Sequence, residues 1–273
     1  MKILLAYFSA TGNTKKIAGY VFEKLKKSGA DVEMLDITPL SVREKKTDLS
    51  LYDAFLFGMP VHSWRAPRIV RNWLKTLDGC GRKCSMFFTY GGFGIHPAHY
   101  TTCKILEERG FLVVSSAEFL AAHTFNLGGW SAMENRPDER DFSVADEYAQ
   151  KTYFRFSSED SKIKKGFEKT DYTSGFLDEI EKFRFRILTQ PPYIKEKECI
   201  ICGICEDFCP TGAMNAESGK ADLKICIACL GCVSACPKNA VFINDMSESF
   251  AYKLSAEKIT KEAMDKKESR IYL

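Results

Sequence analysis

The chain has 273 residues, enough for two ordinary domains, and its 45% hydrophobic and 27% charged residues are typical of globular proteins. The formal net charge is +3, and no basic stripe interleaved with aromatic residues appears, which argues against a nucleic-acid partner. No apolar run is long enough for a transmembrane segment, and the apolar start at 1–10 leads into a polar loop, unlike a cleavable signal. These features predict a cytoplasmic protein whose thiols stay reduced.

Apolar runs alternate with helical patterns over the first two-thirds of the chain. Strands are predicted at 2–8, 32–37, 53–57, 83–89 and 111–119, and helices at 14–28, 67–77 and 97–109. Such alternation is typical of an α/β doubly wound parallel sheet, here with five strands. A further helix at 142–156 is expected to pack back on this sheet.

A polar loop separates the first predicted strand from the first predicted helix. In an open α/β sheet this position binds phosphate, because backbone N–H groups and the helix dipole favour an anion there. The loop offers short hydroxyl and amide donors and one glycine that lets it close around an anion: Ser9, Thr11, Gly12, Asn13 and Thr14. Neither G-x-x-x-x-G-K-[ST] nor G-x-G-x-x-G is present, which argues against ATP and a Rossmann nicotinamide site.

The chain after the predicted sheet has a weaker pattern. Residues 157–173 are rich in lysine and serine and are expected at the surface, whereas 175–188 predicts a connecting helix whose aromatic stripe is more typical of packing than of cofactor binding. The pair Pro191-Pro192 predicts a boundary. The predicted organisation is a first domain, a linker, a cysteine-rich domain and a charged, solvated helical tail, at 1–156, 157–192, 193–245 and 246–273.

Eight of the eleven cysteines form two copies of one spacing, C-x2-C-x2-C-x3-C-P. Corresponding cysteines lie 27 residues apart, as expected for an internal duplication. This run holds [4Fe–4S] clusters in bacterial ferredoxins, where the fourth cysteine of each run binds the other cluster. One cluster is therefore expected on Cys199, Cys202, Cys205 and Cys236, and the other on Cys226, Cys229, Cys232 and Cys209.

Zinc and disulfides are the alternatives for these cysteines. Structural zinc usually requires two close pairs separated by a longer loop, and disulfides require an oxidising compartment, so both fit the spacing less well. The remaining Cys80, Cys84 and Cys103 lack a fourth partner and are expected to be small buried hydrophobes.

Ser9 to Thr14 matches the form S/T-x-T-G-x-T of the FMN phosphate loop of flavodoxins. Together with the cysteine runs, this loop makes the chain resemble the flavodoxin–ferredoxin fusion proteins of anaerobic bacteria and archaea, over residues 1–155 and 193–245. The resemblance implies a flavodoxin-like FMN domain, a small α+β 2[4Fe–4S] ferredoxin domain, and FMN with two [4Fe–4S] clusters as cofactors.

Flavodoxins enclose the isoalloxazine ring of FMN with two further loops, after the third and fourth strands. By resemblance, the candidate contacts here are Pro60, Trp64, Tyr90, Gly91, Gly92 and Phe93. Trp64 is the expected stacking aromatic, with a core tryptophan as the alternative. The second loop lacks the usual acidic residues, so either Tyr90 or Phe93 stacks or the backbone alone lines the flavin. Nearby histidines either approach the flavin or are hydrogen-bonded loop residues: His62, His96 and His123.

FMN accepts two electrons and can release them singly, whereas each cluster moves one electron, so the combination interconverts the two kinds of chemistry. No acid–base set is recognisable, which favours an electron-transfer protein that passes low-potential electrons between a donor and a partner redox enzyme. The alternative is an FMN-dependent oxidoreductase that reduces a small, quinone-like substrate with electrons from the clusters. His62, His96 and Arg65 would then be the candidate proton donors or anion anchor.

A third hypothesis, a docking scaffold that has lost FMN, is disfavoured by the intact loop at 9–14. The expected partners are redox proteins. The sequence is compatible with flavin and cluster meeting either within one subunit or across a homodimer.

Overall fold

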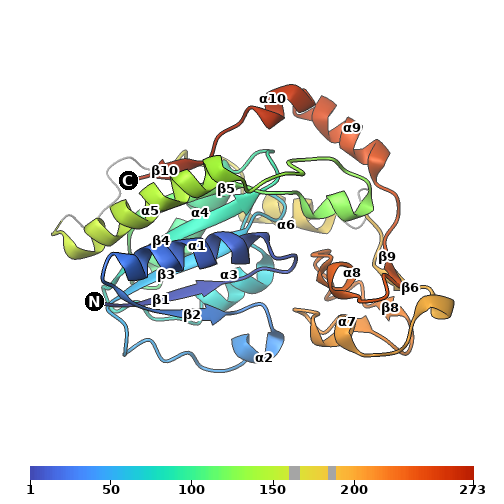
Figure 1. Ribbon diagram of the computed structural model, residues 1–273, viewed down its shortest axis with the longest axis horizontal. Helices are drawn as coiled ribbons and strands as arrows, with labels where there is room; N and C mark the ends of the chain where they lie inside the picture. Colours follow the sequence, from blue (N-terminus) through green and yellow to red (C-terminus); the bar gives the residue numbers. More distant parts are fainter. Residues whose placement is uncertain (160–166, 184–188) are drawn as a thin grey trace.

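The computed structural model describes residues 1–159, 167–183 and 189–273 and contains two sheets (Figure 1). The larger sheet has the order β10-β5-β4-β3-β1-β2. Its five parallel strands confirm the prediction and are β1 (Lys2–Tyr7), β2 (Asp31–Asp36), β3 (Ala54–Pro60), β4 (Lys83–Tyr90) and β5 (Leu112–Leu120). The order 2-1-3-4-5 within it is that of flavodoxin-like folds.

Helices cover both faces of this sheet, so its strands are apolar on both sides. In β1, Ile3 and Leu5 pack with α1 (Asn13–Lys27) and α5 (Glu139–Ser157). The alternate residues, such as Leu4, share a core with α3 (Arg68–Leu74) and α4 (His96–Glu108). Two short elements complete this part of the chain, α2 (Leu40–Arg43) and η1 (Thr124–Gly128).

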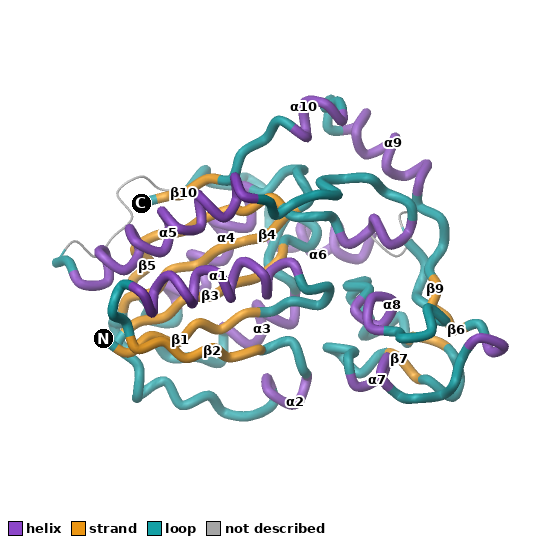
Figure 2. Tube along the Cα trace, viewed as in Figure 1, coloured by secondary structure: helices purple, strands orange, loops and turns teal. Residues whose placement is uncertain are grey.

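The second sheet is small and has the order β7-β8-β6-β9. Each of its strands has two residues: β6 (Tyr193–Ile194), β7 (Met214–Asn215), β8 (Lys220–Ala221) and β9 (Val241–Phe242). The short helices η3 (Glu196–Glu198), α7 (Ile204–Asp207) and α8 (Gly231–Ala235) belong to the same domain. Figure 2 shows this domain facing the carboxyl ends of the parallel strands.

The predicted linker helix is present as α6 (Ser174–Phe183); the rest of the prediction for 175–188 and part of that for 157–173 lie outside the described residues. None of the helices in the described ranges is long and apolar enough to cross a membrane.

The prediction of a wholly helical, solvated tail is wrong. The tail forms α9 (Ser247–Ala256) and α10 (Lys261–Asp265) and ends as β10 (Arg270–Tyr272), which pairs antiparallel with β5. Phe250 and Met264 are buried in the core of the first domain. Charge spacing reports only local helical preference, whereas β10 forms because β5 would otherwise leave an unpaired sheet edge.

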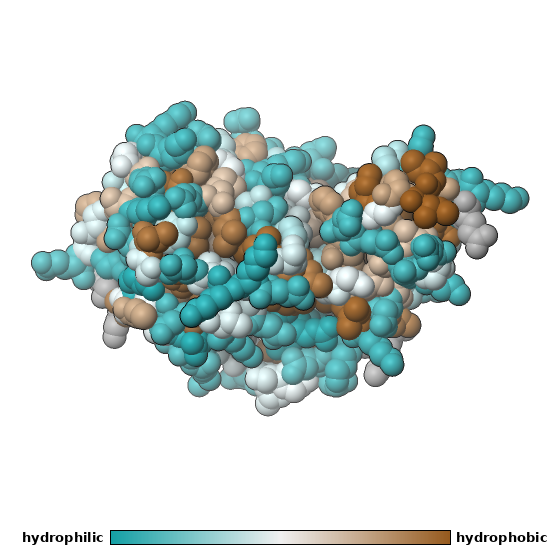
Figure 3. Space-filling view, turned by 90° about the horizontal axis from the view of Figure 1, so that it is seen from below, coloured by the Kyte–Doolittle hydropathy of each residue, from teal (hydrophilic) through white to brown (hydrophobic). Residues whose placement is uncertain are grey.

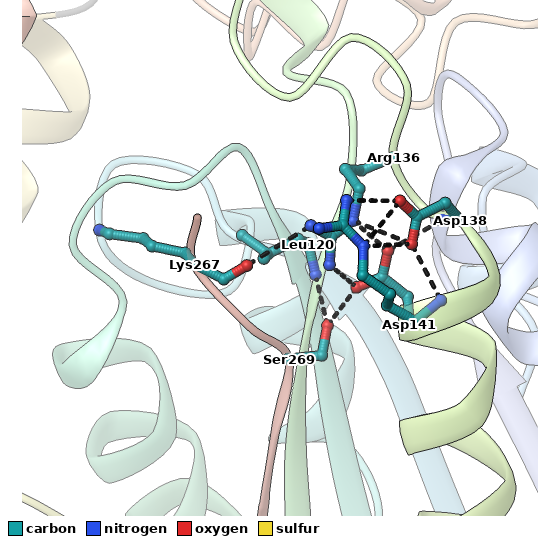
Figure 4. A network of polar contacts seen from close by, with 7 residues as sticks. Leu120, Arg136, Asp138, Asp141, Lys267 and Ser269 are labelled. Carbon is teal, nitrogen blue, oxygen red and sulfur yellow. Dashed lines mark hydrogen bonds and ion pairs between the residues drawn. The ribbon is translucent and has the colours of Figure 1, made fainter. Parts of the chain in front are cut away.

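A buried polar network holds the returning tail against the first domain (Figure 4). Asp141 is fully buried and accepts hydrogen bonds from the guanidinium of Arg136 and the hydroxyl of Ser269. Ser269 in turn accepts a hydrogen bond from the backbone N–H of Leu120, at 3.0 Å. The backbone oxygen of Lys267 accepts from Arg136, at 3.4 Å. The segment that follows the ferredoxin-like part is therefore tied to the sheet.

Candidate functional site

The loop between β1 and α1 lines a cavity of about 480 Å³, a volume that includes the solvent at its mouth. Gly12 adopts φ 91°, a left-handed conformation that favours glycine, at the N-cap of α1. Ser9, Thr11, Asn13 and Thr14 line the cavity. The predicted phosphate-loop residues are thus brought together at a helix N-terminus, where backbone N–H groups favour an anion.

Two of these side chains brace the loop. The Asn13 amide donates to the backbone oxygen of Ala122 at 2.9 Å, and the hydroxyl of Thr14 lies 2.7 Å from that of Thr89. These bonds connect the loop to the ends of β5 and β4. Thr14 is buried, so its side chain supports the loop and also forms part of the cavity wall.

The same cavity brings together the loops after β3 and β4, as predicted, and also the segment after β5. Its further lining includes Pro60, Tyr90, Gly91 and residues 121–124. The segment after β5 was not predicted, apart from His123, whose ring stacks on Trp130 at 4.6 Å between centroids. The Nδ1 atom of His123 accepts a hydrogen bond from the backbone N–H of Phe125 at 3.0 Å.

A tight turn after β3 presents Trp64 to a neighbouring cavity. Ser63 and Trp64 have φ values of 47° and 67°, a left-handed conformation that costs non-glycine residues about 1–3 kcal/mol each. Two backbone hydrogen bonds between His62 and Arg65, at 2.7 and 3.1 Å, close the turn. Strain of this kind persists where the surroundings impose it.

Those surroundings include α6. Arg65 is buried, with 5% of its surface exposed, and its Nη2 atom pairs with Asp178 at 2.7 Å and Glu181 at 3.0 Å. Glu181 also pairs with the buried Arg71 at 2.9 Å. Arg65 therefore fixes α6 and is committed to these carboxylates, contrary to the prediction that it is a candidate anchor for a substrate anion.

The neighbouring cavity is larger, about 1540 Å³ including the solvent at its mouth, and mainly aromatic. Its wall combines the turn after β3, the loop after β4, the segment after β5, and the helices α6 and α9: Val61, Ser63, Trp64, Tyr90, Gly91, Phe93, Gly94, His123, Phe125, Trp130, Phe176, Glu179, Ile180, Tyr252, Lys253 and Ala256. It shares Val61, Tyr90, Gly91 and His123 with the smaller cavity.

Trp64 also contacts the linker, since its ring stacks on Tyr172 at 5.4 Å with an interplanar angle of 27°. Stacking of Trp64 on a flavin stays a prediction. Trp64 is half-buried and lines a cavity, so it is not a core tryptophan, which was the alternative. His62 lines the smaller cavity, and the side chain of His96 lies outside the described part of the chain.

The loop after β4 is glycine-rich because other side chains pack closely against it. A Cβ atom on Gly91 would lie 2.4 Å from the ring of His123. A Cβ atom on Gly92 would lie 2.7 Å from Met133 and 2.8 Å from Met264 of the tail. Tyr90 is buried, which raises the pKa of its phenol, as does the neighbouring Glu118 carboxylate. Tyr90 is therefore a neutral wall of the cavity.

Sequence reasoning missed the walls that α6 and α9 supply. The signals that would have found them are the pairs four residues apart on one helix face, Phe176 with Ile180 and Tyr252 with Ala256. Phe176 was expected to pack against protein, and it does stack on Tyr172 at 5.1 Å, but it also faces this cavity.

In the second domain, one cavity of about 320 Å³ is lined by Cys199, Cys202, Cys205 and Cys236. This is the crossed set predicted for one cluster. Burial raises the pKa of the Cys205 thiol, and Cys236 and Cys199 lie close enough to contribute. Among the described residues no three His, Cys, Asp or Glu side chains converge on a point where one metal ion would sit. Four cysteine residues around one cavity fit the four thiolate ligands that bind the irons of a cubane cluster.

The other predicted set is also assembled. Burial raises the pKa of the Cys232 thiol, and the neighbouring sulfurs that add to the effect are those of Cys229, Cys209 and Cys226. Backbone N–H groups point at sulfur at equivalent places in the repeat, from Ala213 to Cys209 and from Ala240 to Cys236, both at 3.2 Å. Such bonds stabilise thiolates, which are the form that binds iron.

The duplication is visible in the backbone as well. Left-handed φ values recur at positions 27 residues apart, in the pairs Ile201 and Ala228, Gly203 and Leu230, and Gly212 and Asn239. Two turns of one shape therefore surround the two sets of cysteines, and both sets fit a [4Fe–4S] cluster.

The second set lies beside the phosphate loop. A Cβ atom on Gly231 would lie 3.3 Å from the backbone oxygen of Ala10. Cys229 and Leu230 share the apolar core that contains Ala10. Arg43 donates to the backbone oxygen of Pro210 across the same contact.

Comparisons with known proteins agree with this architecture. Residues 4–110 match the model of a flavodoxin domain, and residues 191–237 match that of a 4Fe-4S dicluster domain. The first domain is also similar to a flavodoxin from the domain Archaea, with 16% identity, a TM-score of 0.45, and coverage of 58% of this chain and 100% of that one. Flavodoxin 2 of Bacillus cereus is 22% identical, with a TM-score of 0.43, and the match covers 55% of this chain and 96% of that one.

Curated relatives match the second domain. The polyferredoxin protein MvhB of Methanothermus fervidus is 39% identical over 57 residues, which are 20% of this chain and 13% of that protein. The pyruvate synthase subunit PorD of Methanocaldococcus jannaschii is 36% identical over 53 residues, 18% of this chain and 62% of the subunit. The uncharacterized ferredoxin MJ0722 of the same organism is 38% identical over 56 residues, which are 18% of this chain and 73% of that protein. The chain thus spans less than two-thirds of the first two relatives.

The two matched domain models define the class of this chain, a flavo-iron–sulfur protein. The chain belongs to the ferredoxins through its dicluster domain, which is fused behind a flavodoxin domain. Its cofactors are FMN and [4Fe–4S] clusters.

Proposed function

We propose that this protein couples FMN to two [4Fe–4S] clusters and passes low-potential electrons between a donor and a partner redox enzyme. When bound, FMN exchanges electrons singly or in pairs, and each cluster exchanges one. The observation that carries the proposal is the close approach, within one chain, of Gly231, which lies between Cys229 and Cys232, to Ala10 of the loop after β1. Flavin and cluster then exchange electrons without a second subunit.

The two cysteine sets differ in their exposure. Cys229 and Cys232 are buried, and their set lies against the first domain. Cys202 is exposed and is flanked by the exposed Ile200 and Ile201. The proposed path therefore has an outer cluster on Cys199, Cys202, Cys205 and Cys236, an inner cluster on Cys226, Cys229, Cys232 and Cys209, and FMN beyond it.

Reduction of the anaerobically isolated protein tests the coupling. Dithionite in less than stoichiometric amounts is mixed with the protein, and cluster signals in electron paramagnetic resonance are followed together with flavin absorbance. We expect electrons to distribute between clusters and flavin until both reach one potential. Clusters that stay reduced beside a permanently oxidised flavin would contradict the proposal.

The aromatic cavity favours a second candidate function, an FMN-dependent oxidoreductase for a flat, quinone-like substrate. Without the solvent at its mouth the cavity holds about 530 Å³, within the roughly 300–1000 Å³ of common ligand pockets, and a separate cavity is available for the phosphate end of FMN. The hydroxyl oxygen of Ser63 is buried without a hydrogen-bond partner among the described residues, in the wall of this cavity.

A soluble quinone discriminates between these functions. Its binding is measured by quenching of tryptophan fluorescence in the wild type and in Tyr252→Ala, which removes one wall of the cavity. Saturable binding that the variant weakens, together with turnover fed by dithionite, would support the oxidoreductase. Absence of binding and turnover would leave electron transfer as the function. In either case we propose a cytoplasmic location, where cysteine thiolates stay reduced.

A further inference from the structure

A second large groove lies on the side of the sheet covered by α3 and α4, apart from the cavities already described. Its volume is about 2440 Å³ including the solvent at its mouth, and it is bounded by α3, α4, the chain at 170–182, and the segment 223–227 of the dicluster domain. Cys226, a member of the inner cysteine set, lies in its wall. The groove therefore leads from the surface to the cluster nearest the flavin domain.

The groove is cationic. Seven lysine or arginine residues and three carboxylates line it. Two of the arginines, Arg65 and Arg71, are buried and paired with Asp178 and Glu181, and Lys182 pairs with Glu179. The remaining four cations are exposed and make no ion pair with the described residues: Arg68, Lys75, Lys104 and Lys224. Glu108 is the carboxylate left to oppose them.

Apolar side chains flank the cysteine at the end of the groove. Leu223 and Ile225 are 54% and 41% exposed, on either side of Lys224 and next to Cys226. In Figure 3, hydrophobic residues gather at the end of the molecule formed by the dicluster domain. Short-lived redox complexes combine opposite charges, which steer the encounter, with a small apolar contact.

We propose that this groove docks an acidic one-electron carrier protein, which exchanges its electron with the inner cluster through the edge at Cys226. The carrier loses one electron and the inner cluster gains it, with no bond made and no proton moved. The inference rests on the proposed function, because it assumes that the inner cluster is redox-active.

The dispersion of the four cations favours a protein over a small anion. They come from α3, α4 and the segment 223–227 and are exposed to solvent. A site for a nucleotide or a phosphate encloses its ligand with converging, buried donors. Exposed charges dispersed beside an apolar patch instead match a protein surface.

Carbodiimide cross-linking of the holoprotein to an acidic bacterial 2[4Fe–4S] ferredoxin locates the surface. We expect amide links at Lys75, Lys104 and Lys224, identified by mass spectrometry, because this reagent joins only amines and carboxylates in direct contact. Links confined to lysines outside the groove would overturn the proposal.

Charge reversal then tests the affinity. Lys75→Glu with Lys104→Glu should raise the Kd for that ferredoxin at low ionic strength about tenfold or more, and the difference should shrink as salt screens the charges. The matched control, Lys26→Glu with Lys27→Glu, makes the same change of net charge on the exposed end of α1 and should alter the Kd less than twofold.

Equally weakened ferredoxin binding in both double variants would show that only the net charge of the protein matters and would overturn the proposal. An unchanged Kd in the groove variant would overturn it as well. Pyrophosphate that binds the wild type and not the groove variant, with ferredoxin binding unaffected, would assign the groove to a small anion. Flavin reduction by dithionite should be the same in all three proteins. Loss of that exchange in the wild type would contradict the proposed function and leave the docking result intact.

Discussion

Single residues decide how closely the dicluster domain and the tail approach the loops after β1 and β4. At Gly91 and Gly92 other side chains occupy the space of a Cβ atom, and at Gly231 a Cβ atom would be in tight contact with Ala10. Their role differs from that of Gly12, which supplies a left-handed cap with nothing within 4 Å of a Cβ atom. Close packing, more than backbone freedom, explains the glycine-rich loop after β4.

Gly92→Ala should destabilise the protein through its contact with the tail. A Cβ atom there would lie 2.7 Å from Met133 and 2.8 Å from Met264, at φ 82°. Gly81→Ala is the control, since Gly81 has φ 73° and open space around it. We expect about 1–2 kcal/mol of backbone cost in both variants and about 1–3 kcal/mol more in Gly92→Ala. Urea unfolding measures both; equal losses would mean that the tail moves aside freely.

Gly231→Val should slow electron exchange between the inner cluster and the flavin. The larger side chain must push the cysteine loop away from the backbone oxygen of Ala10, now 3.3 Å from the Cβ position. Ile204→Val is the control, because Ile204 is the equivalent residue of the first repeat. Stopped-flow absorbance after dithionite reduction should show a several-fold slower flavin phase in the first variant alone. An unchanged rate would place the path elsewhere.

At the scale of elements, the two sheets depend on different sources of stability. The parallel sheet has apolar cores on both faces, built from β1 to β5 and the helices α1, α3, α4 and α5. The second sheet has strands of two residues, and its small core includes two cysteines, Cys205 and Cys232. So few apolar contacts do not sustain a domain, so the clusters are expected to hold it together.

Removal of the clusters by anaerobic iron chelation should therefore unfold the second domain and spare the first. Limited proteolysis should then cut within 193–245, while the fragment that contains the parallel sheet persists and far-UV circular dichroism keeps its helical signal. Reconstitution with iron and sulfide should restore resistance. A cleavage pattern that chelation leaves unchanged would show that the domain folds without metal.

At the scale of the whole molecule, the chain leaves the first domain, forms the dicluster domain, and returns to the first sheet as β10. Two covalent connections restrict the motion of one domain relative to the other, in addition to the contact at Ala10. The network around Asp141 secures the second connection, since it joins the tail at Ser269 to Arg136. The backbone oxygen of Arg136 accepts from Ala122 at 2.8 Å, so the same network reaches the cavity wall.

Asp141→Asn should loosen this connection. The variant leaves the buried Arg136 guanidinium with only the more distant carboxylate of Asp138, at 3.5 Å, so it should cost about 3 kcal/mol of unfolding free energy. Glu147→Gln is the control, since its pair with Lys151 is exposed and is expected to contribute at most about 1 kcal/mol. Hydrogen exchange should accelerate in β10 of Asp141→Asn only. Protection of β10 equal to that of the wild type would contradict this role.

The sequence by itself determined the five parallel strands, the loop between the first strand and the first helix, and the spacing of the two cysteine runs. These features are local, because apolar periodicity, a loop between a strand and a helix, and the spacing of ligands are properties of short segments. Tertiary structure alone decided that β10 completes the sheet, that Arg65 holds α6, and that α6 and α9 wall the aromatic cavity. It also placed the inner cysteine set beside Ala10. Each of these depends on contacts between segments far apart in the chain, and no local pattern encodes which surfaces will meet.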